Sequence, residues 1–372
     1  MDVLMLSLGR KILERGSRER VRTEGYAKAL SSLHIIVLTR REYAVASETH
    51  EGTLHLYPTN SRSRFMMPID AFRLALRVVE TPRTEPLVIS AQDPFILGWM
   101  CRFLTLFPKT RFHIQVHGDY FAKGWAGRSL FRHFIRLFAL ILLKSAPAVR
   151  VVSERIRASL VRRGVHADRI TVLPIRPELE SFLAVERVTR SEPPVRFLYV
   201  GRLAPEKDLP RILCAFAETL SRGCDATLRI LGDGGERKRL EALIGSLRLT
   251  ERVRILPWTA DVPAAMAESD VLLLASKHEA YALVLVEAMA AGRPVVTTDV
   301  GCVGEVVEDN VHGIVVRDEG ISPYAAAILR MCVDADFRRT CGERGRERAR
   351  ELARSDDETY VRGWVTALSR AL

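Results

Sequence analysis

The amino-acid sequence predicts an α/β protein of two doubly wound domains, each with a parallel sheet that helices cover on both faces. The chain has 372 residues, too many for one ordinary hydrophobic core, and fits two domains of roughly 150–200 residues. Continuous apolar runs such as Val271–Ala275 are typical of strands buried on both faces of a parallel sheet. These runs alternate with helical patterns, and that alternation predicts the fold class.

The second half of the chain shows the alternation most regularly. Strands are expected at Val195–Val200, Thr227–Leu231, Val253–Leu256, Val271–Ala275, Val295–Thr298 and Gly313–Val316. Helices are expected at Pro210–Leu220, Glu236–Leu247, Val262–Glu268, Leu283–Ala291 and Pro323–Asp334. The first half repeats the pattern less regularly, with strands near Val3–Leu8, His34–Thr39, Leu87–Ser90, Arg111–Val116 and Val149–Val152.

A polar segment at residues 189–194, which ends in two prolines, marks the boundary between the halves. We therefore predict an N-terminal domain over residues 1–190 and a C-terminal domain over residues 191–354. Residues 355–372 are expected to form a last helix, anchored by Trp364, that packs back toward the N-terminal domain.

The charge of the chain is unevenly distributed. The net charge is +11, yet residues 1–190 hold 31 Lys and Arg against 17 Asp and Glu, whereas residues 191–372 hold 25 against 28. A basic half predicts an anionic partner, which is a membrane surface, a nucleic acid or a phosphorylated substrate. The six cysteines show no CxxC spacing, which argues against a zinc site and a disulfide framework and favours a reducing cytosol.

Two apolar segments bear on the location of the protein. Residues 1–8 lack the basic flank and the long apolar run of a signal peptide, and they predict a first buried strand instead. The run Leu137–Leu143 is far too short to span a bilayer. We therefore expect a protein that is not integral to the membrane.

One carboxylate lies inside an otherwise apolar helical segment. Glu287 stands in the run from Ala280 to Ala291, and apolar residues on every side are typical of a buried helix. An ionised carboxylate there is unfavourable unless it is paired or fully hydrogen-bonded. Its partner is either an arginine in a structural ion pair or a hydroxyl-rich ligand, and the segment alone favours neither.

Glycine turns follow the first two strands of the second half. Arg202 and Lys207 lie five residues apart after Gly201. The arginine offers a fork of hydrogen-bond donors and the lysine a point charge, which together suit a diphosphate. The alternative is that both are ordinary loop cations in contact with solvent. The next strand leads into Gly232-Asp-Gly-Gly, but Arg237 stands where a dinucleotide-binding fingerprint has its last glycine, so a tight turn is favoured there. The sequence contains no GxxxxGK[ST] motif for nucleotide hydrolysis.

Three motifs, in their order and spacing, resemble the retaining glycosyltransferases of family four, which have the GT-B fold. They are Gly201-Arg-Leu-x-x-Glu-Lys207, Gly232-Asp-Gly, and Glu279-x7-Glu287 followed by Ala-Met-Ala-Ala-Gly-x-Pro294. The resemblance is strongest over residues 195–320. It implies two Rossmann-like domains that face each other across a cleft, and sugar transfer from a nucleotide diphosphate sugar with retention of the anomeric configuration.

The resemblance implies a role for each matching residue. Arg202 and Lys207 would hold the donor diphosphate and stabilise the leaving group. Glu287 would accept hydrogen bonds from the ribose hydroxyls, and Glu279 would face the transferred sugar. Further donor contacts, partly through backbone N–H groups at a helix N-terminus, are expected from Gly201, Gly232, Ala282, Leu283 and Val284. Because side chains neutralise the phosphates, we expect no metal site and no cofactor.

The chain departs from the family pattern in three places, one of which is Pro257, where glycine is common before the base-binding segment. Ala280-Tyr281-Ala282 stands where the family usually has Gly-Phe-Gly, and two added methyl groups crowd the backbone near the phosphate or the sugar. In the first half, the glycine-rich first loop is reduced to Ser7-Leu8-Gly9-Arg10. Ser90-Ala-Gln-Asp93 and Gln115-Val-His117 lie after strands where acceptor-side motifs are found. His117 is predicted to contact the transferred sugar; a satisfied core histidine is the alternative.

The segment Phe121–Lys144 interleaves basic and aromatic residues along a predicted helix. Its basic residues are Lys123, Arg128, Arg132, Arg136 and Lys144. This pattern is typical of a helix that lies on an anionic membrane, and the alternative is a core helix with a solvated basic face. The basic first half favours the membrane.

The sequence therefore predicts a cytoplasmic glycosyltransferase, peripherally associated with the inner face of the membrane. Its partners would be a nucleotide-sugar donor and a saccharide acceptor in polysaccharide or envelope synthesis. A lipid-linked acceptor is expected, because it fits the basic domain. One alternative is a sugar-nucleotide isomerase on the same fold, which needs further acid and base residues. The other is a nucleic-acid-binding protein, for which the chain lacks a recognition motif; we expect no nucleic-acid partner.

Overall fold

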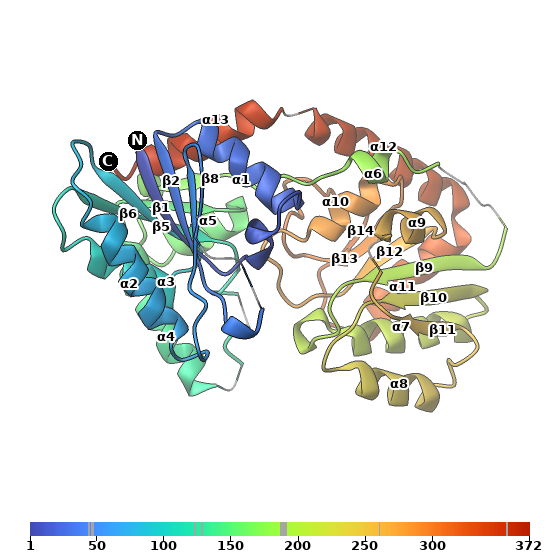
Figure 1. Ribbon diagram of the computed structural model, residues 1–372. Coiled ribbons are helices and arrows are strands. Elements are labelled where there is room, and N and C mark those ends of the chain that lie inside the picture. Colours follow the sequence, from blue (N-terminus) through green and yellow to red (C-terminus); the bar gives the residue numbers. More distant parts are fainter. Residues whose placement is uncertain are drawn as a thin grey trace. The chain divides into compact units, whose positions relative to one another are not determined.

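The computed structural model describes residues 1–43, 45, 48–122, 124–127, 129–186, 192–259, 261–354 and 356–372. The chain forms two compact units (Figure 1). Unit 1 comprises Met1–Phe121, Ala126–Pro174 and Asp356–Leu372, and unit 2 comprises Ala122–Trp125 and Ile175–Ser355. Residues 189–191 of the predicted boundary segment, together with Lys123, Arg128 and Ser355, lie outside the described residues.

Unit 1 contains one sheet with the strand order β3-β4-β2-β1-β5-β6-β7-β8. Its strands are β1 Asp2–Ser7, β2 Ser32–Val37, β3 Thr49–Glu51, β4 Leu54–Pro58, β5 Leu87–Ala91, β6 Thr110–Val116, β7 Ala148–Val151 and β8 Ile170–Val172. The edge strand β3 pairs antiparallel with β4, and the other neighbouring strands pair in parallel. The strand order reverses between β1 and β5, as in a doubly wound sheet.

Six α-helices are described in unit 1: α1 Arg18–Lys28, α2 Met67–Val79, α3 Ile96–Leu104, α4 Leu130–Ser145, α5 Glu154–Val161 and α13 Asp357–Ser369. Ser17, Ser129 and Ser153 cap α1, α4 and α5, because each hydroxyl accepts a hydrogen bond from a backbone N–H of the first turn. The helix predicted from Phe121 onward begins only at Leu130. The left-handed backbone of Gly124 and Gly127 precludes a regular helix before the Ser129 cap.

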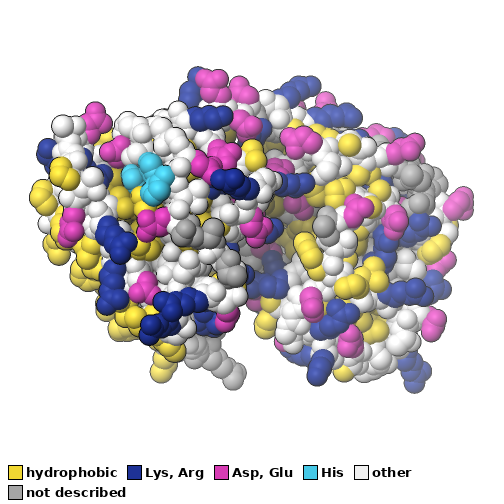
Figure 2. All heavy atoms as spheres, viewed as in Figure 1, with side chains coloured by type: hydrophobic (Ala, Val, Ile, Leu, Met, Phe, Trp, Pro, Cys, Tyr) yellow, Lys and Arg dark blue, Asp and Glu magenta, His cyan; other side chains and the backbone are white. Residues whose placement is uncertain are grey.

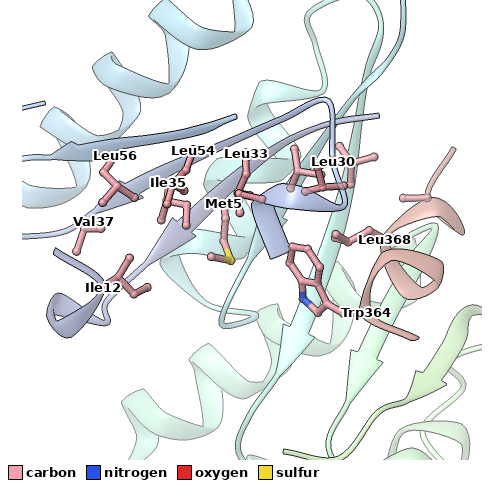
Figure 3. Close-up of a cluster of buried hydrophobic side chains, with 14 of the residues drawn as sticks. Met5, Ile12, Leu30, Leu33, Ile35, Val37, Leu54, Leu56, Trp364 and Leu368 are labelled. Carbon is pink, nitrogen blue, oxygen red and sulfur yellow. The ribbon is translucent and has the colours of Figure 1, made fainter. Parts of the chain in front are cut away.

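The core of unit 1 includes side chains from both ends of the chain (Figure 3). Met5 of β1 and Leu33 and Ile35 of β2 form a cluster with Trp364 and Leu368 of α13. The Trp364 ring also stacks on Tyr26 of α1, with 4.4 Å between ring centroids. Truncating a buried Trp typically destabilises a protein by about 3–5 kcal/mol, so α13 is an integral part of unit 1.

Unit 2 contains a six-stranded parallel sheet with the order β11-β10-β9-β12-β13-β14. The strands are β9 Val195–Val200, β10 Ala226–Leu231, β11 Val253–Leu256, β12 Val271–Leu274, β13 Val295–Thr298 and β14 Gly313–Val316. The helices are α6 Glu180–Leu183, α7 Leu209–Ser221, α8 Arg237–Ser246, α9 Val262–Ala267, α10 Leu283–Ala290, α11 Ile321–Val333 and α12 Ala335–Ala353. Counted from β9, this is the strand order 3-2-1-4-5-6 of dinucleotide-binding Rossmann folds.

A disulfide in unit 2 corrects the expectation from cysteine spacing. Cys224, which follows α7, is bonded to Cys332 in the last turn of α11, across 108 residues of sequence. The two helices pack against each other, so residues distant in sequence become neighbours. Spacing rules detect motifs within one loop and do not report such tertiary proximity. Cys101, Cys214, Cys302 and Cys341 are thiols that do not take part in this disulfide.

A helix that crosses a bilayer needs about 20 predominantly apolar residues. Within the described ranges, no helix combines the length and the apolar composition that such a span needs.

Candidate active site

The strand order of unit 2 brings the loops after β9 and β12 together. The two strands are neighbours in the sheet but not in the sequence, and ligands of open α/β sheets bind at the carboxyl ends of such a strand pair. Arg202 and Lys207 follow β9, whereas Ser276 and Glu279 follow β12. A hydrogen bond of 2.8 Å from the Lys277 N–H to the Glu206 carbonyl joins the loops.

Lys207 and Glu279, which the sequence places 72 residues apart, form an ion pair in this structure. The Lys207 Nζ lies 2.5 Å from Glu279 Oε1, and both side chains are largely buried. The Ser276 hydroxyl donates a hydrogen bond of 2.7 Å to the same carboxylate oxygen. The Thr298 hydroxyl in turn donates to the Ser276 carbonyl, 2.7 Å away. The carboxylate of Glu279 is therefore held in place by partners from two loops.

Arg202 presents its charge to solvent at the end of β9. Its side chain is 71% exposed, and it forms an ion pair of 2.8 Å with Glu206. The Tyr199 hydroxyl donates a hydrogen bond of 3.0 Å to the Arg202 carbonyl, which fixes the backbone below the guanidinium. An exposed ion pair contributes little to stability, so the guanidinium can exchange Glu206 for an incoming anion at small cost.

The glycines of the first two loops allow their backbones to pack closely. A Cβ on Gly232 would lie 1.9 Å from the carbonyl oxygen of Gly201, and a Cβ on Gly234 would lie 2.3 Å from that of Leu203. Any larger residue would push the loops after β9 and β10 apart. This structural role accounts for Gly232 without a ligand, and the prediction that Gly232 contacts the donor stays a prediction.

The helix α10 begins with a residue in an unusual conformation. Its N-cap residue Ala282 has φ 63° and ψ 58°, the left-handed region that glycine adopts readily and alanine rarely. The Tyr281 carbonyl accepts a hydrogen bond of 2.8 Å from the Cys302 N–H, which anchors the loop. The first N–H groups of a helix, here those around Leu283 and Val284, have no intrahelical acceptors and favour an anion.

Glu287 lies on α10, and no arginine among the described residues pairs with it, although the sequence left that possibility open. Over the described ranges, no side chain forms a hydrogen bond or an ion pair with its carboxylate. Desolvation by burial raises the pKa of Glu287, with no opposing contribution. The carboxylate is therefore a half-buried acceptor whose bonding capacity is unused.

The predicted acceptor-side motifs lie at the carboxyl ends of β1, β5 and β6 in unit 1. The Ser7 hydroxyl donates a hydrogen bond of 2.8 Å to Gln92, across the strand pair where the order of this sheet reverses. The Ser7 oxygen also accepts from the Gly9 N–H at 3.0 Å. Asp93 accepts from the Phe95 N–H at 2.8 Å, and burial raises the pKa of Asp93. Hydrogen-bonded side chains thus occupy this end of the sheet.

His117 follows β6 directly, and its half-buried ring has a buried nitrogen that no described residue satisfies. Its Nε2 atom has no hydrogen-bond partner in the described part of the chain. Burial, followed by the charges of Arg150 and Arg22, lowers the pKa of His117 to about 3. The imidazole is therefore neutral at physiological pH, and it is not the satisfied core histidine of the alternative interpretation.

Arg150 is a polar residue of unit 1 that sequence reasoning missed. Its guanidinium is buried and donates to the Gln115 side chain at 2.8 Å, to the Tyr360 hydroxyl at 2.8 Å and to the Leu173 carbonyl at 3.1 Å. All three acceptors are neutral. An arginine in the apolar strand Ala148–Val151 was the signal that could have revealed it.

The structure brings most predicted donor residues to one region of unit 2. Gly201, Arg202 and Lys207 follow β9, Glu279 pairs with Lys207, and Ala282–Val284 begin the helix that carries Glu287. His117 belongs to unit 1. The residues of unit 2 thus offer two cations, a helix N-terminus and an unused carboxylate, which together suit a phosphorylated, hydroxyl-bearing ligand.

Comparison with protein families decides the relationship. The family model described as "Glycosyl transferases group 1" matches residues 184–348, and the model described as "Glycosyl transferase 4-like domain" matches residues 19–176. The chain belongs to the group 1 glycosyltransferases. In this family context the three motifs after β9, β10 and β12 fall within the first matched region, and His117 within the second.

Two named relatives illustrate how far the similarity of this group 1 glycosyltransferase extends. The chain is 31% identical over 253 residues to an alpha-D-kanosaminyltransferase of Streptomyces kanamyceticus, which covers 65% of this chain and 62% of that enzyme. It is 31% identical over 159 residues to an N-acetyl-alpha-D-glucosaminyl L-malate synthase of Bacillus anthracis, covering 43% of this chain and 42% of the relative. The chain thus spans less than two thirds of these curated relatives.

Solved structures show the same fold. A sucrose-phosphate synthase from Thermosynechococcus elongatus superimposes with a TM-score of 0.76 at 22% identity, covering 98% of both chains. The Anabaena protein HepE, solved in complex with UDP and glucose, gives a TM-score of 0.73 at 19% identity and covers 99% of both chains. The group 1 glycosyltransferase therefore has the GT-B fold, with one Rossmann-like sheet in each unit.

Proposed function

We propose that the protein transfers a sugar from a nucleotide diphosphate sugar to a saccharide acceptor, with retention of the anomeric configuration. The observation that carries the proposal is Glu287, a carboxylate that burial has desolvated and that no described residue satisfies. Burying an unpaired carboxylate is unfavourable because it loses hydrogen bonds to water. We infer that hydrogen bonds from a bound ligand compensate for this loss. Two vicinal ribose hydroxyls are suitable donors for one carboxylate.

The other residues of unit 2 suit the rest of the donor. Arg202 and Lys207 would neutralise the diphosphate, aided by the N-terminus of α10, so that no metal ion is required for this task. Glu279, held by Lys207 and Ser276, would face the transferred sugar. The HepE structure, which contains UDP and glucose, supports a donor of this class.

The reaction that we propose exchanges two bonds on one face of the sugar. The bond between the anomeric carbon and the leaving phosphate oxygen breaks, and the acceptor oxygen bonds to the same carbon. The acceptor proton passes to the departing phosphate oxygen, so no protein base is assigned. Arg202 and Lys207 stabilise the negative charge that develops on the diphosphate, and His117 in its neutral form would contact the sugar near the reacting carbon.

A donor-hydrolysis assay with a panel of nucleotide sugars tests the proposal, because it needs no acceptor. Lys207→Ala is expected to lower turnover by about 100-fold or more, as loss of a charge-stabilising group does. Glu287→Gln should weaken binding of the nucleoside diphosphate at least 10-fold. Because the amide carries no desolvated charge, this variant should unfold at the same or a higher urea concentration than the parent.

Lys277→Ala is the matched control for Lys207→Ala. Lys277 lies on the β12 loop, is largely exposed and faces Asp208 at 3.8 Å, so its loss should leave turnover unchanged. Wild-type turnover in Lys207→Ala or Glu287→Gln would refute the donor site. Conversion of the nucleotide sugar to an isomer with no release of nucleotide would identify the isomerase activity instead.

We also propose that unit 1 docks on an anionic membrane, where a lipid-linked saccharide would be the acceptor. The helix α3 packs against α4, and together they expose a set of large side chains that we call the α3–α4 apolar face. This face comprises Ile96, Phe103, Leu130, Phe131, Phe134, Leu137, Phe138 and Ile141. Leu130 and Phe131 are 86% and 71% exposed.

The α3–α4 apolar face has the chemistry of a membrane contact. The Phe134 and Phe138 rings lie 4.4 Å apart and Trp99 lies 6.1 Å from Phe138, so aromatic side chains form one continuous surface. Arg132 and Lys144 on the same helix are exposed beside it. Figure 2 shows yellow and dark blue side chains gathered over this part of unit 1. Exposed apolar residues with a basic rim match an anionic bilayer better than a neutral protein surface.

Flotation with liposomes tests the docking face. We expect two double variants to lose most of their retention on vesicles with anionic lipid. They are Phe131→Ser/Phe134→Ser and Arg132→Gln/Arg136→Gln. Arg222→Gln/Arg239→Gln removes the same charge from exposed positions of unit 2 and should float like the wild type. Equal flotation of all variants would show that this face does not bind the bilayer. A dimer of the free protein that dissociates in the phenylalanine variant would show that a second copy of the chain covers the face instead.

A further inference from the structure

Three histidines stand side by side at the outer edge of the sheet of unit 1. His55 of β4 lies directly opposite His50 of the antiparallel edge strand β3. On its other side, His55 is in register with His34 of the parallel strand β2. Residues in register point to the same face of a sheet, so three imidazoles form one row across three strands. This arrangement, which we call the histidine row, is unrelated to the donor residues of unit 2.

The rings of the histidine row are in direct contact. The Nδ1 atoms of His50 and His55 lie 2.9 Å apart, so one ring donates a hydrogen bond to the other. The rings of His34 and His55 stack with 4.6 Å between their centroids. The Nδ1 of His34 lies 3.0 Å from the Tyr57 hydroxyl, and the Tyr57 ring meets His50 edge-on. The Tyr57 hydroxyl thus engages one ring nitrogen of His34. We call His50 and His55, whose Nδ1 atoms lie opposite each other, the facing pair.

The facing pair is open to solvent and has acidic groups nearby. His50 is exposed, and Figure 2 shows a cyan patch on the surface of unit 1. Glu48 acts electrostatically on Tyr57, and Asp2 acts on His34. Arg77 forms an ion pair of 3.6 Å with Glu48, and Arg83 lies 3.9 Å from Asp2. Burial lowers the pKa of both His34 and His55. The Arg83 charge also lowers the pKa of His34, by more than Asp2 raises it, whereas the charge that acts on His55 is that of His50. A cation is therefore less favoured at His34 than at the facing pair.

We propose that His50 and His55 bind a divalent transition-metal ion through their Nδ1 atoms. Imidazole nitrogen is a ligand of borderline ions such as copper, nickel and zinc. Among the described residues no group of three or more His, Cys, Asp or Glu is placed to hold an ion, so water completes the coordination. The proton on Nδ1 of the donating ring moves through solvent to Nε2 of the same ring, so that both neutral rings offer an Nδ1 lone pair. Each ring turns about its Cβ–Cγ bond, a torsion with broad minima, to aim that lone pair at the ion, while the two Nδ1 atoms stay close to their 2.9 Å separation.

The spacing of the two nitrogens selects among metal ions. With metal–nitrogen bonds of about 2.0–2.1 Å, the two Nδ1 atoms subtend an angle of about 90° at the ion. Neighbouring ligands in tetragonal and octahedral complexes meet at this angle, whereas tetrahedral ligands spread wider. The site should therefore prefer Cu²⁺, then Ni²⁺, over the tetrahedral ion Zn²⁺, in keeping with the general affinity order.

Titration calorimetry of the full, untagged chain with CuCl₂, NiCl₂ and ZnCl₂ tests the proposal. The wild type should bind one Cu²⁺ per chain at this site, with nitrogen hyperfine coupling from two imidazoles in its electron paramagnetic resonance spectrum. His50→Ala and His55→Ala should each weaken binding at least 10-fold. His34→Ala should change it by less than a factor of three, because the Tyr57 contact keeps His34 from acting as a ligand.

His166→Ala is the control, since His166 is an exposed histidine of unit 1 that lies outside the row. Equal copper affinity in His50→Ala and the wild type would overturn the proposal, as would a one-nitrogen spectrum. Bound ion should also raise the melting temperature of the wild type but not of His50→Ala, because it ties β3 to β4 only in the folded state. None of these outcomes depends on sugar transfer.

Discussion

The carboxyl ends of the two sheets are equipped with opposite kinds of groups. In unit 2 this end carries charged side chains in ion pairs, Lys207 with Glu279 and Arg202 with Glu206. In unit 1 the equivalent end holds the hydrogen-bonded Ser7 and the uncharged imidazole of His117, close enough to the buried Arg150 for its charge to act on that ring. Both ends lie where a doubly wound sheet binds ligands. The same topology therefore serves two different chemistries.

The contrast matches the two substrates that we propose. A diphosphate requires cations that can exchange one anionic partner for another, and the ion pairs of unit 2 hold such cations in position. An acceptor hydroxyl requires donors and acceptors of hydrogen bonds without a fixed charge, and a neutral imidazole provides both. Three changes test this division of labour.

The largest effect is expected from His117. Because its Nε2 is buried without a partner among the described residues, His117→Ala should lower the rate of transfer to an acceptor by about 100-fold, a loss typical of a group that contacts the reacting centre. The affinity for the nucleoside diphosphate, measured by calorimetry, should stay unchanged, because unit 2 holds that part of the donor. His166→Ala serves as the exposed control. If His117→Ala weakened nucleotide binding as strongly as it slowed transfer, the proposed division of the two substrates between the units would be wrong.

Local sequence patterns predicted unit 2 far better than unit 1. Strand β9 was placed at its observed bounds, because a six-residue run that is apolar except for Arg196 lies between a proline pair and a glycine and is typical of a buried strand. The edge strand β3 was missed, since three polar residues Thr49–Glu51 carry no apolar signal. The burial of Arg150 was missed too, because its acceptor Tyr360 lies 210 residues away. Contacts of that separation leave no trace in a local pattern.

The sequence predicted those residues of the candidate site that belong to a motif within a single short segment. The spacing of Glu279 and Glu287 indicated a carboxylate pair, but only the structure shows that one is paired with Lys207 and the other has no described partner. The histidine row was not predicted either. Its signal was the symmetric placement of His50 and His55 about the turn at Gly52, and recognising it requires the strand pairing.

Acid should destabilise unit 1 more than unit 2. Burial lowers the pKa of both His113 and His117 to about 3, below the usual value of 6.5. As the pH falls below about 6.5, these two histidines become protonated in the unfolded chain but not in folded unit 1. The free energy of unfolding therefore decreases with falling pH down to about pH 3. The slope is about 1 kcal/mol per pH unit for each such histidine. Above pH 6.5 the contribution is fully present.

Hydrogen exchange at pH 7 and pH 5, corrected for intrinsic rates, measures the two units in one experiment. In unit 2 burial also lowers the pKa of His312, but Glu308 opposes the shift. The protection of β1, β5 and β6 should therefore fall more than that of β9 and β12. His113→Gln should reduce the difference, because glutamine takes up no proton on unfolding. Equal loss of protection in both units would show that the buried histidines do not govern acid stability.

The smallest effect concerns the Ala282 backbone, where unit 2 departs from its family pattern. An L-residue in the left-handed region is disfavoured by about 1–2 kcal/mol, and replacing alanine by glycine costs about 0.4–1 kcal/mol through the unfolded chain. Ala282→Gly should therefore stabilise the protein by up to about 1 kcal/mol in urea unfolding. Ala280→Gly, at a position without positive φ, should destabilise it by a similar amount. Equal destabilisation by both would show that Ala282 is not strained.

The kinetics of Ala282→Gly separate two reasons for keeping the alanine. A Cβ on Gly301 would lie 2.9 Å from the Ala282 methyl, so the methyl group lies against the loop after β13 at the start of α10. If the methyl only fills this space, the KM for the nucleotide sugar should not change. If it shapes the donor pocket, the variant should accept nucleotide sugars that the wild type rejects. A more stable but less selective Ala282→Gly would show that unit 2 retains backbone strain for donor choice.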